Sequence, residues 1–177
     1  MGVSEVEVVF DASLRPLRAY KRSTAPGPQD IAARTDTRIY DLRGEHVEMR
    51  RRMPLGELER FVYRAPTPGA IIGPGRGLLS AWFRRAHLSV GGRLRESVLD
   101  IRESVEVVRD VTLLRLEDRD DERLGRRVRV YTIYGREPIY ADEDDFVIGD
   151  MMGLLPADMV HSPMPTPMAT DGPPTPS

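Results

Sequence analysis

The sequence predicts a mainly β protein with one helix (α+β), in which an antiparallel, twisted and partly closed sheet wraps around a single amphipathic helix. One observation is that only residues 71–88 repeat their apolar side chains at helical spacing. A second is that most other segments alternate apolar and polar residues, as half-buried strands do. The third is that short turns rich in Gly, Pro or Asp separate these segments. We expect a single sheet of about eight to ten strands.

The helix is expected at residues 78–88. Its apolar face would carry Leu78, Leu79, Trp82, Phe83 and Ala86, and its opposite face Ser80, Arg84 and His87. The glycine-rich residues 73–77 disfavour helix before this segment, and Gly91 and Gly92 favour a stop after it. A helix of about three turns is marginal alone in water, so it must bury its apolar face against the sheet.

Alternating patterns place the strands on both sides of the helix. Before it they predict strands at residues 5–10, 17–22, 37–42, 47–51 and 58–64, with a loop over 23–36. After it they predict strands at residues 94–101, 105–116, 128–134, 138–141 and 146–148, with a loop over 118–125. Because residues 99–111 are rich in Glu and Arg, helix stays an alternative there.

The chain divides into one β-rich domain, residues 1–155, and a tail. Residues 156–177 are rich in proline and poor in large apolar groups, which predicts a disordered tail. The alternative for this tail is a PxxP motif that binds a partner.

Charge and composition exclude several classes of protein. The formal net charge is -2, so no basic field is present to attract nucleic acid. No apolar run approaches the roughly 18 residues of a membrane span. The absence of cysteine excludes disulfides, thiol catalysis and cysteine-ligated metals. Because residues 1–10 lack the pattern of an export signal, we expect the periplasm or cell envelope if a leader has been removed, and the cytoplasm otherwise.

The glycine-rich entry to the helix is the one candidate anion site. Backbone amides at such a position bind phosphate in nucleotide-binding loops, and here Gly75, Arg76 and Gly77, together with Arg84, would form the site. Leu78, however, stands where a dinucleotide fingerprint has its third glycine, and the Lys and Ser or Thr of a P-loop are absent. We interpret this run as a tight loop into a packed helix, with anion binding as the alternative.

The remaining polar clusters have simple structural interpretations. The acidic residues 142–145 are expected to form an exposed hairpin turn, with a hard cation as the alternative. Three histidines lie on unrelated segments without metal-ligand spacing. Tyr131, Tyr134 and Tyr140 are expected to pack across strands, although a stacking surface for bases or sugars is the alternative. We therefore expect no metal and no cofactor.

Two segments carry a resemblance to a known group of proteins. RGLLSAWFRRAHLSVGGRLRESVLDIRE followed by VRVYTIYGREPIYADEDDFVIGD resembles, over residues 71–153, uncharacterised bacterial exported or envelope proteins that are similar in shape to lipoprotein-carrier half-barrels. The resemblance implies a sheet curled around the helix. Its concave apolar face would hold an acyl chain or a partner's hydrophobic segment, and would be lined by Leu79, Trp82, Phe83, Val130 and Tyr134. It supplies no catalytic residue.

The resulting hypothesis is a non-enzymatic, envelope-associated binding or scaffold domain whose partner is a hydrophobic small molecule or another protein. The alternative is an enzyme or anion-binding protein that uses residues 73–77. A third hypothesis is a purely structural module in which a sheet edge pairs with a partner strand.

Overall fold

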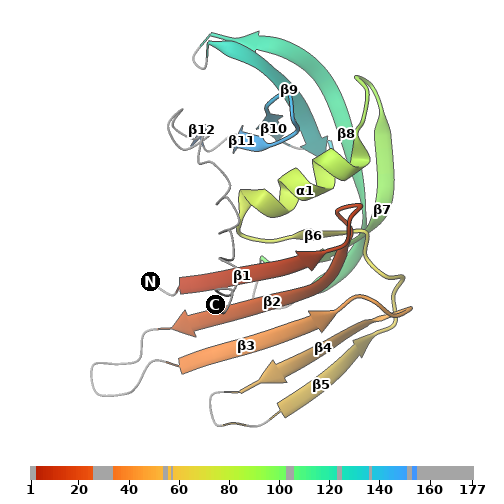
Figure 1. The fold of residues 1–177 in the computed structure, drawn as a ribbon, viewed down its shortest axis with the longest axis vertical. Coiled ribbons are helices and arrows are strands. Elements are labelled where there is room, and N and C mark those ends of the chain that lie inside the picture. The colour runs from red at the N-terminus through yellow and green to blue at the C-terminus, as the bar shows by residue number, and fades with distance from the viewer. Residues whose placement is uncertain are drawn as a thin grey trace, which may run out of the picture.

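The computed structural model confirms a mainly β protein with one helix (Figure 1). It describes residues 3–25, 34–53, 56, 58–102, 106–122, 125–135, 137–150 and 153–154. The strands of these residues form two sheets, of five and seven strands, and not the single sheet of eight to ten strands that was expected. The predicted tail, residues 156–177, lies outside the described residues.

The N-terminal sheet contains five antiparallel strands in chain order. They are β1 (Val3–Phe10), β2 (Pro16–Ala25), β3 (Arg34–Asp41), β4 (Val47–Arg52) and β5 (Leu58–Tyr63). All five were predicted, but β2 and β3 are longer than expected. Ser23 and Thr24 still pair with β1, so part of the predicted loop over 23–36 is strand.

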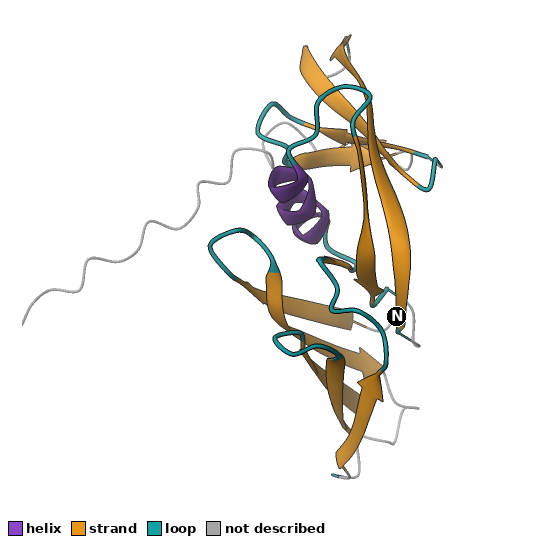
Figure 2. Ribbon diagram, turned by 90° about the vertical axis from the view of Figure 1, so that its right-hand side faces the viewer, coloured by secondary structure: helices purple, strands orange, loops and turns teal. Residues whose placement is uncertain are grey.

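The second sheet curls as a half-barrel around the helix (Figure 2). In order across the sheet it contains β12 (Gly153–Leu154), β11 (Val147–Asp150), β10 (Pro138–Ala141), β9 (Arg126–Ile133), β8 (Val107–Asp121), β7 (Arg93–Asp100) and β6 (Ala70–Ile72). Residues 107–111 are strand, so the helix alternative there is excluded, and β8 runs on into the predicted loop over 118–125.

One pair of strands departs from the expected antiparallel pattern. β6 pairs with β7 in parallel, with Ile71 opposite Leu99. The helix α1 (Arg76–Ala86) lies between these two strands in the chain. A parallel pair needs such a crossover, since a short hairpin reverses the chain direction.

The helix begins and ends two residues earlier than predicted, at Arg76–Ala86 instead of residues 78–88. Gly75 is extended and caps its start, while His87 takes a left-handed conformation (φ 42°) and donates its backbone N–H to the carbonyl oxygen of Phe83. Ser80 was expected on the polar face but is buried together with Trp82 and Phe83. The face that contacts the sheet is therefore not purely apolar.

The half-barrel packs on both of its faces around β6 and β7. On one side, Ile72 and Val98 join the core that contains Trp82 and Phe83 of the helix. On the other side, Ile71, Leu99 and Ile101 pack against apolar residues of the N-terminal sheet, namely Ala19, Tyr40, Leu42, Val47 and Met49. Successive residues of a strand point to opposite faces, so these two short strands connect both cores.

Buried polar contacts also connect the two sheets. The ammonium group of Lys21 donates to the carbonyl oxygen of Ile101 at 2.6 Å. The carboxylate of Glu106, just before β8, accepts hydrogen bonds from Arg38 at 2.5 Å and from Tyr40 at 2.7 Å. The sheets are therefore fixed by specific polar pairs as well as by apolar packing. Among the described residues, no helix is long and apolar enough to cross a membrane.

Candidate functional site

A cleft of about 670 Å³ lies beside the start of α1 and the ends of the neighbouring strands. Its volume is in the range of pockets that bind small molecules. The apolar part of its wall comes from six side chains, Ile72, Leu79, Ile133, Pro138, Ile139 and Val147. The polar part comes from Arg76, Arg102, Arg109, Asp110, Tyr134, Glu137 and Asp150. The cleft therefore combines an apolar floor with a charged rim.

The floor is the edge of the core that contains Trp82 and Phe83, which we call the helix core. Ile72 ends β6 and Val147 begins β11, and both are buried members of that core. Leu79, Ile133 and Ile139 are partly buried against it. Because the floor is held by packed neighbours, its shape is formed before any ligand arrives.

The rim is ordered by the buried carboxylate of Asp100. This carboxylate accepts hydrogen bonds from Arg102 at 2.7 Å and from Arg109 at 2.6 Å. Burial alone would raise the pKa of Asp100, but hydrogen bonds from the Arg102 side chain and backbone outweigh it and lower the pKa. The guanidinium of Arg109 also lies over the ring of Tyr134, 5.3 Å from its centroid. Asp100 thus fixes two guanidinium groups, one of which supports Tyr134.

Of the residues proposed for anion binding, the structure places one in the cleft and the others outside it. Arg76 lines the cleft, whereas Arg84 is an exposed residue of the helix that does not line it. Gly75 and Gly77 are exposed, and a Cβ added at either would meet no atom within 4 Å. The packing of the fold itself therefore does not require glycine at either position.

Of the residues proposed to line an apolar face, two line the cleft and three are buried elsewhere. Leu79 and Tyr134 line the cleft. Trp82 and Phe83 are fully buried in the core, where Phe83 stacks on Tyr131 with 4.3 Å between ring centroids. Val130 belongs to a separate buried cluster with Val128 and Ile148. Side chains thus fill most of the predicted face, and open space remains at one end.

Sequence reasoning did not identify Ile133, Ile139, Arg102 or Arg109 as site residues. The alternation of β9 was recognised, but the side of this strand that contacts the helix core carries Tyr131 and Ile133. Ile133 and Ile139 could have been identified from the sequence, since both are apolar and flank the turn at Tyr134. Arg102 and Arg109 could not have been identified from the sequence, because their positions depend on hydrogen bonds to Asp100.

Trp82 and Arg85 hold the C-terminal half of α1, whereas the cleft lies beside its start. The indole N–H of Trp82 and the guanidinium of Arg85 both donate to the carboxylate of Glu96 on β7. Arg85 also donates to the carbonyl oxygen of Gly69 at 2.9 Å. These bonds fix the rotation of the helix and therefore the direction in which Leu79 points.

The acidic turn at residues 142–145 is stabilised by its own contacts. Asp142 Oδ1 accepts backbone N–H bonds from Asp144 and Phe146. Asp145 is buried, and its carboxylate binds the Tyr131 hydroxyl at 2.6 Å and Arg129 at 2.8 Å. Burial and then this carboxylate raise the pKa of Tyr131. Within the part of the chain that the structure describes, no group of three or more His, Cys, Asp or Glu residues is placed to hold a metal ion.

Comparisons with known proteins give little more. No family model matches the chain, and its sequence matches no curated protein. Among solved structures, the chain is similar to a DUF1089 family protein from Pseudomonas aeruginosa, at 13% identity and a TM-score of 0.45. The match covers 84% of this chain and 88% of that chain.

Proposed function

We propose that the protein is a non-enzymatic binding domain that holds an amphiphilic small molecule in the cleft beside the start of α1. The observation that carries this proposal is the combination, in one cleft of about 670 Å³, of an apolar floor and a charged rim. Burial of a ligand's apolar part on Leu79, Ile133 and Ile139 would supply most of the affinity, and the rim would orient its polar part.

The composition of the cleft favours binding over nucleophilic catalysis. The described lining residues include no Ser, Thr, Cys or His, so none of them supplies an aliphatic hydroxyl, a thiol or an imidazole for nucleophilic attack. The rim also favours a polar, hydrogen-bonding group over a strong anion. Asp110, Glu137 and Asp150 offset the three arginines in charge, and Asp100 already engages two of these arginines. An uncharged or zwitterionic head group fits such a rim better than a dianion does.

Association with the cell envelope stays a prediction of the resemblance over residues 71–153. A ligand with an acyl chain would be consistent with that location. Fractionation of cells that produce the protein at native level tests it, and a purely cytosolic distribution would contradict the envelope assignment without affecting the cleft.

The cleft itself is tested with a zwitterionic fluorescent acyl probe, a dansylated lysophosphatidylcholine, and the purified full chain. Leu79→Trp fills the floor and should weaken probe binding by about tenfold or more, because apolar area available to the ligand is lost. Leu116→Trp is the matched control, since Leu116 is exposed on β8 and does not line the cleft. Ile139→Trp repeats the test from another strand in case the helix variant is unstable.

Native mass spectrometry followed by organic extraction complements the probe. A co-purifying amphiphile that is present in the parent protein and in Leu116→Trp, but absent from Leu79→Trp, would support the proposal. Equal probe affinity in all variants, with circular dichroism showing them folded, would refute the cleft as the binding site.

A further inference from the structure

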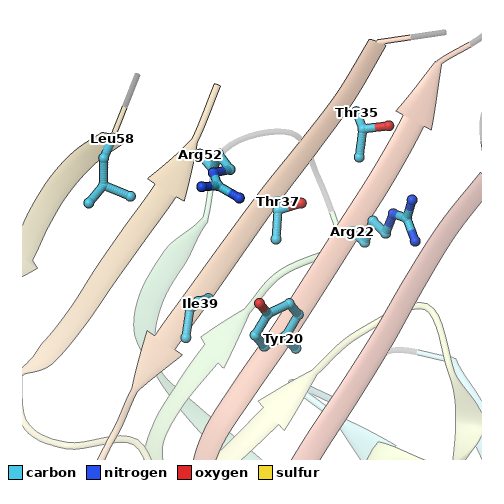
Figure 3. Close-up of a pocket in the computed structure, with 7 residues that line it drawn as sticks. All are labelled: Tyr20, Arg22, Thr35, Thr37, Ile39, Arg52 and Leu58. Carbon is cyan, nitrogen blue, oxygen red and sulfur yellow. The ribbon is translucent and has the colours of Figure 1, made fainter. Parts of the chain in front are cut away.

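The outer face of the N-terminal sheet carries a second, separate pocket. It has a volume of about 410 Å³ and lies over the four strands β2 to β5 (Figure 3). Tyr20 and Arg22 of β2, Thr37 and Ile39 of β3, Arg52 of β4 and Leu58 of β5 line it. The alternate residues of these strands, such as Ala19 and Tyr40, point to the core on the other side. The pocket is therefore remote from the cleft beside α1.

The strand register brings two arginines to the same row across the sheet. Arg22 is opposite Thr37, and Thr37 is opposite Arg52. Neighbouring strands are about 4.8 Å apart, so the two arginines start from positions about 10 Å apart with the Thr37 hydroxyl between them. Two long cationic side chains thus flank one hydrogen-bonding group. An anion above Thr37 would lie within reach of both.

These two arginines differ from the others on the same face in that no carboxylate of the described residues pairs with them. Arg18 pairs with Asp41, while Arg50 and Arg60 both pair with Glu48, at 3.0 and 2.8 Å. For the side chains of Arg22, Arg52 and Thr37, no hydrogen bond or ion pair is formed with any described residue. Glu5 is opposite Arg22 in the register but forms no ion pair with it. Among the described residues, the row therefore presents two arginines that form no ion pair, with Glu5 at its β1 end.

The pocket also has apolar walls beside this row. Tyr20 and Ile39 are opposite each other in the next row, and Leu58 of β5 is opposite Arg52 at the end of the arginine row. Leu58 is 70% exposed and Tyr20 is 43% exposed, so both have surface available for contact. A ligand with a small apolar or aromatic body can lie on these side chains while its charged end meets the arginines.

We propose that this pocket binds a soluble phosphomonoester, with the phosphate between Arg22 and Arg52 and its organic part on Tyr20 and Leu58. A phosphate dianion matches two guanidinium groups in charge and offers enough oxygens for both, whereas one arginine suffices for a carboxylate. The Thr37 hydroxyl donates a third hydrogen bond.

The arginine side chains need a small rearrangement to engage the phosphate. In Figure 3 the guanidinium of Arg52 lies toward Thr37, whereas that of Arg22 extends toward β1. Binding therefore rotates Arg22 back over the pocket. Exposed side chains exchange rotamers within nanoseconds, so this movement adds no slow step.

The test is a titration of the ¹⁵N-labelled full chain with phenyl phosphate, followed through the arginine Nε–H and backbone signals. We expect saturable shifts of Arg22, Arg52 and the β3 amide of Thr37. Arg52→Gln and Arg22→Gln should each weaken binding by about tenfold or more, because each removes a charge-assisted hydrogen bond. Arg50→Gln is the matched control, since Arg50 lies on the same strand and face but is paired with Glu48.

Three results would overturn the proposal. The first is the absence of saturable shifts, and the second is equal weakening by Arg50→Gln and Arg52→Gln, which would indicate only general attraction. The third is binding to phosphatidylcholine vesicles that contain phosphatidic acid without binding to phenyl phosphate, which would identify a membrane surface as the partner. Tighter binding of phenyl phosphate than of inorganic phosphate, lost in Leu58→Ser, would support the assigned role of the apolar wall.

Discussion

The hydroxyl of Tyr40 donates a 2.7 Å hydrogen bond to the carboxylate of Glu106, and this bond connects the N-terminal sheet to the half-barrel. Both side chains are buried. Burial first, and then the neighbouring carboxylate, raise the pKa of Tyr40. The phenol therefore stays protonated and acts as the hydrogen-bond donor. Burial also opposes the charge on Glu106, but the hydrogen bond from Tyr40 and the contact with Arg38 prevail and lower the pKa of Glu106. A charged carboxylate therefore joins the two sheets.

Removal of this hydrogen bond should destabilise the protein. We expect Tyr40→Phe to lower the free energy of unfolding by about 1–3 kcal/mol, because a buried carboxylate loses a donor. Urea denaturation followed by circular dichroism measures the change. Glu117→Gln is the control, as its carboxylate is largely exposed and pairs with the exposed Arg119. A Tyr40→Phe variant as stable as the parent would show that the bond does not contribute to joining the sheets.

Stability should fall in mild acid. Asp36, Asp100 and Glu106 all have pKa values below their ordinary values of 3.8 for Asp and 4.5 for Glu, each because bonds from arginine or tyrosine outweigh the effect of burial. A carboxyl group with a lowered native pKa stabilises the fold above its unfolded pKa. This contribution is lost as the pH falls through the native pKa.

Urea midpoints measured from pH 7 to pH 3 check this dependence. We expect a plateau above the ordinary carboxyl values and a decline below them. Glu106→Gln should be less stable than the parent on the plateau and should show a shallower decline. A decline of equal steepness in both proteins would assign the acid sensitivity to other groups.

Ser80 should be essential to the contact between the helix and β11. Its hydroxyl accepts the backbone N–H of Val147 at 2.8 Å and donates to the carbonyl oxygen of Arg76 at 3.1 Å. We expect Ser80→Ala to cost about 1–3 kcal/mol, since it leaves a buried N–H without an acceptor.

Amide hydrogen exchange gives the specific measurement for this contact. The Val147 amide should exchange faster in Ser80→Ala, while Ser89→Ala, at an exposed position, should leave it unchanged. Unchanged protection of Val147 in Ser80→Ala would mean that another group takes over the acceptor role.

Local patterns predicted most of the strands and the helix. The strands that have one face in a core carry alternating side chains, and the alternation is visible in the sequence. β6 was not predicted because it has only three residues and is buried on both sides, so Ile71 and Ile72 show no alternation. The early start of the helix was missed because Gly77 disfavours helix locally, whereas packing of Leu79 and Trp82 against the sheet stabilises it.

The cleft was predicted in part, through Leu79, Tyr134 and Arg76. The sequence shows which residues of a strand share a face, but not which face meets the helix, so Val130 was assigned to the apolar lining in place of Ile133. Arg102 and Arg109 of the rim were not predictable, because Asp100, which holds them, is recognised only by its burial.

The sequence by itself determined the α+β class, the alternation of the strands and the place of the helix, because these depend on neighbouring residues. Tertiary structure decided that the strands form two sheets, that Glu106 joins them, that Trp82 and Phe83 are core, and that the open space lies beside Leu79. These features depend on contacts between residues far apart in the chain, such as Tyr40 with Glu106 and Ser80 with Val147. No local pattern encodes which distant polar group will satisfy a buried one.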